Sequence, residues 1–267
     1  MKMDGRWKNW LRENIQRGCD LDELRGILRR EKFDEADIEE QFRAAATAAA
    51  DPKTAKVNYE ALSKIKITRT AKKVDTDWAQ LYVLDHFMTP EECEKLISLA
   101  PDYYRPSTVT TGEKYFRTSS TCDLYEKLDP FVRVIDERIA KTLGIHLAYA
   151  EVTQIQHYDV TQEFKPHTDF FEPGSAEYLK YASFSGNRTW TFMVYLNETK
   201  KGGGTKFVNL DKTFYPKTGT ALVWNNLYAD GRPNHDTMHW GQPVEEGTKV
   251  IITKWFREQC AVPMFIE

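Results

Sequence analysis

From about residue 78 onward, apolar and β-branched residues come in short runs that glycine, proline, asparagine and aspartate separate. The runs are rich in residue types that favour strands; they are AQLYVLDHF, AEVTQIQHYDV, TWTFMVYL, TKFVNL, TALVWNNL and TKVIITKWF. Two stretches with helical spacing, PEECEKLISLA after Thr89 and EKLDPFVRVIDERIAKTL over residues 126–143, predict helices beside them. We therefore expect a mainly β fold of the α+β type, in which helices flank a double sheet.

Residues 1–45 follow a different, helical pattern. Their apolar residues fall in three bursts: Trp7, Trp10, Leu11 and Ile15; Leu21, Leu24, Ile27 and Leu28; Phe33, Ile38 and Phe42. Asp20 and Asp34 are the predicted N-caps of the second and third helices. The alanine-rich stretch that follows ends at Asp51-Pro52, where a helix should stop. We predict a helical N-terminal module over residues 1–50, which packs or docks a partner, and a second domain over residues 57–267.

Charge and composition exclude several classes of protein. Lys and Arg total 37 and Asp and Glu total 40, so the net charge of -3 gives no global attraction to nucleic acid. No apolar run approaches the length of about 18 residues that a membrane span needs, and the opening MKMDGRWKNWL lacks the apolar region of a signal peptide. We expect a cytoplasmic chain without nucleic-acid or membrane partners. Its four cysteines lack a paired spacing and are expected to be free thiols.

A histidine and an aspartate two residues apart form the first candidate site. His167 and Asp169 can reach one ion, because alternate residues of a strand point to the same side. Two imidazoles and one carboxylate that leave three positions open are the ligand set of non-haem Fe(II) oxygenases. His239 is the candidate third ligand, and His235, in a loop-like context, is its rival. A His-x-Asp pair alone is a weak signal, and an ordinary surface or core histidine is the alternative.

Lys249 is the second candidate. An iron site of this kind needs a co-substrate that supplies two electrons, and a 2-oxo acid can chelate the metal while a cation holds its far carboxylate. Lys249 precedes Val250, Ile251 and Ile252, so it lies among residues that look buried, and a buried ammonium requires an anionic partner. The alternative is an outward-facing lysine on an alternating strand.

Six segments of the chain follow one another in a familiar order. They are RTSSTCDL, HYDVTQEFKPHTDFF, GNRTWTFMVYLN, KGGGTKF, KTGTALVWNNL and HWGQPVEEGTKVIITKWFRE. Together, over residues 78–258, they resemble the prolyl 4-hydroxylase group of the iron(II)- and 2-oxoglutarate-dependent dioxygenases. The resemblance implies a double-stranded β-helix, a jelly-roll variant, whose mouth holds the metal. It also implies Fe(II) as cofactor and 2-oxoglutarate and O2 as co-substrates, with ascorbate as an additional candidate cofactor.

The resemblance also assigns roles to residues. The implied iron ligands are His167, Asp169 and His239. The residues implied to bind 2-oxoglutarate are Lys249, at the distal carboxylate, and Tyr158 and Thr191, which line the pocket. The positions matching residues that contact the peptide or target residue in the family are Arg117, Arg188 and Trp255.

One position departs from the family and bears on the substrate. Phe164 stands where the peptidyl-proline enzymes carry a tyrosine that helps to hold the target ring. Three functions therefore stay open, in this order: a hydroxylase of a prolyl residue in a protein or peptide, which releases succinate and CO2; a hydroxylase of a free amino acid or other small molecule; and a non-enzymatic binding module on a retained barrel scaffold. The complete ligand set and Lys249 favour an enzyme.

Overall fold

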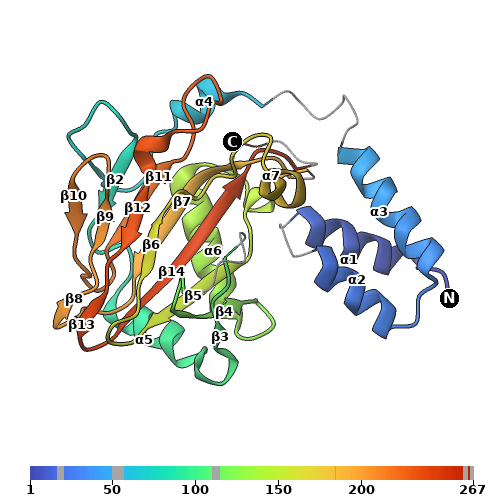
Figure 1. Cartoon of the computed structure of the whole chain (residues 1–267), viewed down its shortest axis with the longest axis horizontal. Helices are drawn as coiled ribbons and strands as arrows, with labels where there is room; N and C mark the ends of the chain where they lie inside the picture. The colour runs from blue at the N-terminus through green and yellow to red at the C-terminus, as the bar shows by residue number, and fades with distance from the viewer. Residues whose placement is uncertain (17–20, 50–56, 110–114, 184, 261–263, 265–267) are drawn as a thin grey trace.

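The computed structural model describes residues 1–16, 21–49, 57–109, 115–183, 185–260 and 264 (Figure 1). Within them the α-helices are α1 (Gly5–Gln16), α2 (Leu21–Arg30), α3 (Glu35–Ala49), α4 (Tyr59–Ser63), α5 (Pro90–Ser98), α6 (Pro130–Leu143) and α7 (Ala176–Tyr181). Short 3-10 turns cover Pro101–Tyr103, Leu147–Tyr149 and His235–Thr237. No helix of the described residues combines the length and apolarity that crossing a membrane requires.

The strands form one large and two small antiparallel sheets. In spatial order, the large sheet contains β1 (Lys72–Lys73), β2 (Leu81–Leu84), β11 (Ala221–Asn225), β7 (Arg188–Tyr195), β14 (Lys249–Arg257), β5 (Thr153–Tyr158), β4 (Ser120–Leu124) and β3 (Arg105–Pro106). The second sheet contains β10 (Lys212–Phe214), β9 (Thr205–Phe207), β12 (His239–Gly241) and β6 (Phe164–His167). The third sheet pairs β13 (Val244–Glu246) with β8 (Lys201–Gly202). The expected mainly β fold is confirmed.

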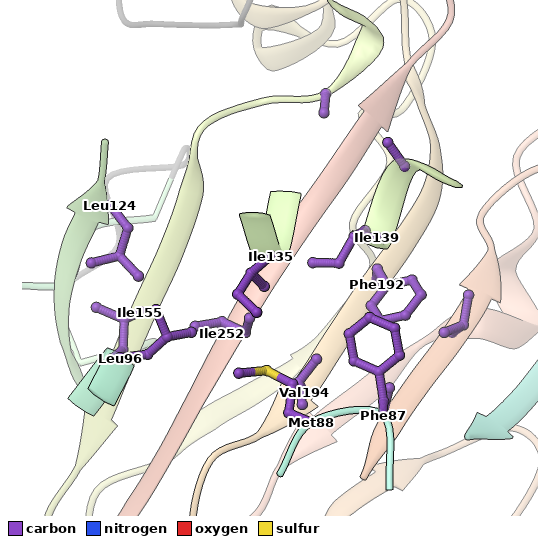
Figure 2. Close-up of a cluster of buried hydrophobic side chains, with 14 of the residues drawn as sticks. Phe87, Met88, Leu96, Leu124, Ile135, Ile139, Ile155, Phe192, Val194 and Ile252 are labelled. Atoms are coloured by element: carbon purple, nitrogen blue, oxygen red, sulfur yellow. The ribbon is translucent and has the colours of Figure 1, made fainter. Parts of the chain in front are cut away.

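The large sheet is covered on both faces, which explains the nearly continuous apolar runs of its central strands. On one face, Phe192 and Ile252 join α5 and α6 in the larger hydrophobic cluster (Figure 2). On the other face, Met193 and Ile251 pack in a second cluster with residues of the small sheet. Neighbouring residues of a strand alternate between these two clusters, as the pleat requires. Every residue of β7 after Arg188 is therefore buried.

The two flanking helices begin where proline and a capping side chain place them. Thr89 caps α5 in a capping box with Glu92, as its position before Pro90 predicts. The helix predicted over residues 126–143 begins later, at Pro130, because Asp129 precedes the proline in an extended conformation and caps the helix. Gly144, in the left-handed conformation with φ 71°, ends it.

The N-terminal helices α1 to α3 form a cluster of their own, with Leu11, Leu28 and Ile38 at its centre. The predicted helices are present, and α3 begins directly after the predicted cap Asp34. The predicted cap Asp20 and the boundary at residues 51–52 lie outside the described residues, so the division into two domains stays a prediction. The helices pack beside α7 (Figure 1), where Ser185 Oγ donates a hydrogen bond to the carbonyl of Ile15 at 3.2 Å.

Ile252 tests the packing of the large sheet against its helices. The side chain is fully buried, so Ile252→Ala should lower the free energy of unfolding by about 2–5 kcal/mol through lost contacts and a cavity. Val134→Ala on α6 is the control, because Val134 is 51% exposed and should change stability by less than about 0.5 kcal/mol. Urea denaturation measures both, and equal effects would contradict the assigned core.

Candidate active site

Two neighbouring strands of the second sheet, β12 and β6, bring the candidate metal ligands together. β12 pairs with β6 so that His239 lies directly opposite His167, and their ring centroids are 4.2 Å apart. Asp169 follows two residues after the end of β6. Its Oδ1 lies 4.0 Å from His167 Nε2 and 3.9 Å from His239 Nε2. One ligand atom from each of the three residues lies within 4.8 Å of the other two.

Backbone carbonyls fix the orientation of both imidazoles. His167 Nδ1 lies 2.8 Å from the carbonyl oxygen of Lys165, and His239 Nδ1 lies 2.9 Å from that of Thr237. Because a carbonyl only accepts, each Nδ1 carries the proton and each Nε2 presents a lone pair toward Asp169. Burial, followed by the neighbouring His239, holds the pKa of His167 well below its ordinary value. The neutral imidazole required of a metal ligand is therefore favoured.

The side chain of Thr191 holds Asp169 in place. The Thr191 hydroxyl donates to Asp169 Oδ2 at 2.7 Å. Thr191 is fully buried and is absent from the residues that line the adjacent cavity. Its hydroxyl thus holds the ligand carboxylate, and its role in the co-substrate pocket stays a prediction.

The ligand set fits a ferrous ion. Two neutral imidazoles and one carboxylate converge from one side, and all three side chains are at least largely buried. This combination, with the remaining coordination positions open, suits the non-haem iron of oxygenases. Other divalent ions with mixed nitrogen and oxygen preference would also bind such a set, so Co(II) and Mn(II) are suitable probes.

The triad opens into a cavity that Lys249 also lines. Lys249 begins β14 opposite Tyr158, and its side chain is only 1% exposed. Its Nζ lies over the rings of Tyr158 and Tyr195, 5.2 and 5.8 Å from their centroids. No carboxylate or hydrogen-bond acceptor of the described residues pairs with it, and burial lowers its pKa to about 7. A ligand that brings a negative charge would remove this cost.

Aromatic side chains form much of the remaining cavity wall. The ring of Phe164 stacks on His167 with a centroid separation of 3.4 Å. Tyr158 and Trp255 also line the cavity, and the Tyr158 hydroxyl donates to Gln156 Oε1 at 2.9 Å. The predicted position of Tyr158 in the cavity thus agrees with the structure. Trp255 Nε1 is buried without a hydrogen-bond partner among the described residues.

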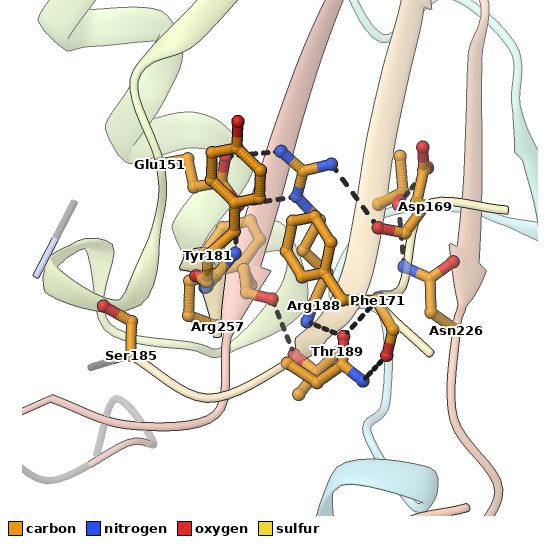
Figure 3. Close-up of polar contacts among 12 residues, drawn as sticks. Glu151, Asp169, Phe171, Tyr181, Ser185, Arg188, Thr189, Asn226 and Arg257 are labelled. Carbon is orange, nitrogen blue, oxygen red and sulfur yellow. Dashed lines mark hydrogen bonds and ion pairs between the residues drawn. The ribbon is translucent and has the colours of Figure 1, made fainter. Parts of the chain in front are cut away.

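Arg188 lies between the metal ligand and a buried carboxylate (Figure 3). Its guanidinium forms two bonds to Glu151, at 2.6 and 2.7 Å, and a longer one of 3.4 Å to the backbone carbonyl of Asp169. It also stacks 4.0 Å from the centroid of the Trp255 ring. Arg257 bonds the same Glu151 at 3.0 Å. Burial raises the pKa of Glu151, but the two guanidiniums outweigh it and keep the pKa below its usual value.

The segment between Asp169 and Arg188 is closed at its base. The side chain of Asn187 accepts a bond from the Phe171 N–H and donates one to the Phe171 carbonyl, both at 2.8 Å. α7 lies within the segment that this pair encloses. Asn187 thus links the two ends of the insertion directly.

Arg117 lies on the other side of Phe164, with its guanidinium 4.9 Å from the ring centroid. It donates hydrogen bonds to Ser119 Oγ at 3.2 Å and Thr121 Oγ1 at 3.0 Å. Arg117 and Arg188 are thus both near the cavity, but neither belongs to its lining. Their roles as peptide contacts stay predictions.

No sequence motif marks Glu151, Asn226 or Gln156 as part of the site. Glu151 lies before a strand without any motif, and only the fold brings Arg188 and Arg257 to it. Asn226 bonds Thr191, 35 residues away in sequence. For Gln156, a polar residue within the strand run TQIQHY is the sequence feature that could have indicated a role in the site.

Two histidines distinguish the metal site from its rival. His239→Ala should abolish measurable Co(II) binding, because it removes one of three ligand atoms. His235→Ala should leave binding unchanged, since His235 is 61% exposed and lies 3.5 Å from Glu172. Calorimetric titration of each apoprotein with Co(II) measures the difference. Loss of binding in the His235 variant alone would transfer the ligand role to His235.

Comparison with known proteins agrees with this geometry. Residues 153–257 match the model of the 2OG-Fe(II) oxygenase superfamily. The prolyl 4-hydroxylase subunit alpha-3 of Mus musculus is 33% identical over 199 residues, which are 72% of this chain and 36% of that protein. The subunit alpha-2 of Gallus gallus is 31% identical over 195 residues, 70% of this chain and 36% of that protein. The chain thus spans about a third of the length of these relatives.

A solved structure supports the fold. The collagen prolyl hydroxylase of Paramecium Bursaria Chlorella virus-1, in complex with 2OG, aligns with a TM-score of 0.51 and 21% identity, covering 68% of this chain and 97% of that one. This similarity confirms the predicted double-stranded β-helix. The matched segment contains all three candidate ligands and Lys249. Residues 153–257 therefore match the 2OG-Fe(II) oxygenase superfamily, and prolyl 4-hydroxylase subunits are among the relatives of this chain.

Proposed function

We propose that this chain is an Fe(II)- and 2-oxoglutarate-dependent dioxygenase that hydroxylates a prolyl residue in a protein or peptide, with release of succinate and CO2. The observation that carries the proposal is the buried ammonium of Lys249, which has no anionic partner among the described residues and lies in the same cavity as the three ligands. A triad alone could be structural. A triad beside an uncompensated buried cation fits a co-substrate that binds metal at one end and carries a carboxylate at the other.

Each part of the site has a task in this function. Iron held by His167, Asp169 and His239 would supply the oxidative chemistry in which O2 and 2-oxoglutarate are consumed. Lys249 would bind the distal carboxylate and so orient the co-substrate along the cavity. The apolar and aromatic wall, with Phe164, would exclude water from the reacting groups.

The peptide substrate is supported by the relatives and by the cavity wall. The curated relatives are named as prolyl 4-hydroxylase subunits. Trp255 lines the cavity, and its N–H has no hydrogen-bond partner among the described residues, so it could meet a peptide carbonyl. The missing hydroxyl at Phe164 is the single feature that favours a small molecule, and the comparisons give that alternative no support. The intact triad and Lys249 argue against a non-enzymatic scaffold.

The role of the N-terminal helices, the location of the chain in the cell and the use of ascorbate are proposed from the sequence. The helices of residues 1–50 are proposed to dock a partner, because their charged faces are balanced and no ligand of the site comes from them. The cytoplasmic location and the use of ascorbate likewise stay predictions.

Two lysines of β14 separate co-substrate binding from stability. Lys249→Met should weaken 2-oxoglutarate binding by about 10- to 100-fold, since it removes a charge-assisted contact of about 1.5–3 kcal/mol. It should keep or raise the free energy of unfolding, because an unpaired buried ammonium is lost. Titration of Mn(II)-loaded protein measures the affinity, and urea denaturation the stability.

Lys254→Met is the matched control. Lys254 is equally buried but bonds the Glu151 carbonyl and Thr153 at 3.0 Å and pairs with Asp136 at 2.9 Å. Its loss should cost about 3–5 kcal/mol of stability with little change in 2-oxoglutarate affinity. Equal affinity in the Lys249 variant and the parent would refute the assigned role.

The substrate class is tested by supplying the two candidate substrates in separate reactions. The chain is supplied with Fe(II), 2-oxoglutarate, O2 and ascorbate, together with either a proline-rich peptide or free proline. We expect succinate release that matches a gain of one oxygen atom by the peptide, seen by mass spectrometry, and no product from free proline. His239→Ala gives the background. Product from free proline but not from the peptide would establish the small-molecule alternative.

A further inference from the structure

Asn226 lies immediately after β11 and is held from both sides by backbone hydrogen bonds. Its side chain and backbone are fully buried. Its N–H donates to the carbonyl of Thr189 at 2.7 Å, and its carbonyl accepts from the N–H of Asn234 at 2.9 Å. The residue is therefore fixed between β7 and the loop that leads into β12.

The side chain of Asn226 reaches one metal ligand through one intermediate. Its Nδ2 donates to Thr191 Oγ1 at 2.8 Å, and the Thr191 hydroxyl donates to Asp169 Oδ2 at 2.7 Å. A ligand carboxylate is ionised and only accepts, so the single hydroxyl proton of Thr191 points to Asp169. Asn226 must then present its amide N–H to Thr191. Both hydrogen bonds of this relay, from Asn226 to Thr191 and from Thr191 to Asp169, thus run toward the carboxylate.

The backbone of Asn226 reaches a second ligand. Asn234, which bonds the Asn226 carbonyl, accepts at its own carbonyl from the Thr237 hydroxyl at 2.7 Å and the Thr237 N–H at 3.1 Å. The carbonyl of Thr237 in turn accepts from His239 Nδ1 at 2.9 Å. One buried residue thus joins Asp169 and His239, which are 70 residues apart in sequence.

We infer that Asn226 is a positioning residue for the metal centre, which acts through Thr191 to keep Asp169 a one-oxygen ligand. The inference rests on the metal-dependent function proposed above. Oδ2 is engaged by Thr191, whereas Oδ1 faces the Nε2 atoms of both histidines. Without the relay, Oδ2 becomes free to bind the metal as well. That second oxygen would take a coordination position that the co-substrate needs.

The test compares side chains that keep or remove the relay. Thr191→Val and Asn226→Ala should each shift the affinity for Co(II) by about 10- to 100-fold, because Asp169 is no longer held as a one-oxygen ligand. They should also alter the visible absorption spectrum of the Co(II)-loaded protein, which reports the number and geometry of ligands. Thr191→Ser keeps the hydroxyl and should restore the parental affinity and spectrum. Thr191→Val preserves the shape of the side chain, so it remains informative if Asn226→Ala does not fold.

Thr189→Val supplies the matched control. Thr189 is buried on the same strand, and its hydroxyl donates to the Phe256 carbonyl at 3.1 Å, away from the ligands. It should lose stability comparably but keep the affinity for Co(II) and the spectrum. If Thr191→Val and Asn226→Ala retain both parental values, the inference is wrong. If the parent itself binds no Co(II), the proposed function fails instead.

Discussion

The pairing of β12 with β6 is the constraint on which the site depends. It sets His239 against His167 across two short strands, and each imidazole is then oriented by a carbonyl of its own segment. Because side chains alternate along a strand, a slip of one residue would turn one imidazole to the opposite face of the sheet. β12 is also paired with β9 on its other edge, so its register is held from both sides. The relative position of the two histidine ligands is therefore set by the register of the sheet.

Strand β14 contains two buried lysines, and only one of them has an anionic partner among the described residues. Lys254 faces the helix side, where Asp136 of α6 pairs with it. Lys249 faces the small sheet and has no anionic partner among the described residues. The two positions are an odd number of steps apart along the strand (254 minus 249 is 5), which places the two ammoniums on opposite faces. One charge is compensated by the fold itself, and the other awaits a ligand.

Much of the fold and the centre of the site could be predicted from the sequence, because they depend on residues that are close together along the chain. The run TKVIITKWF predicts β14, and the spacing His167-x-Asp169 predicts two ligands that lie close together, although Asp169 lies just beyond the end of β6. The bond of Thr191 to Asp169 joins β7 of the large sheet to the segment after β6 of the second sheet, so it depends on how the two sheets pack. Glu151 and Asn226 carry no motif at all. Their partners come from distant strands and loops, so only the tertiary structure reveals them.

The Asn187–Phe171 clamp has a consequence for how this architecture can diversify. The chain leaves the barrel just after a metal ligand and returns just before Arg188, and two hydrogen bonds of one side chain join the exit to the re-entry. A change of length in the loop that they enclose therefore need not alter the separation between Asp169 and Arg188. The loop meets the barrel again where the Tyr181 carbonyl accepts a hydrogen bond from Arg257, so a longer loop would have to preserve that second contact as well.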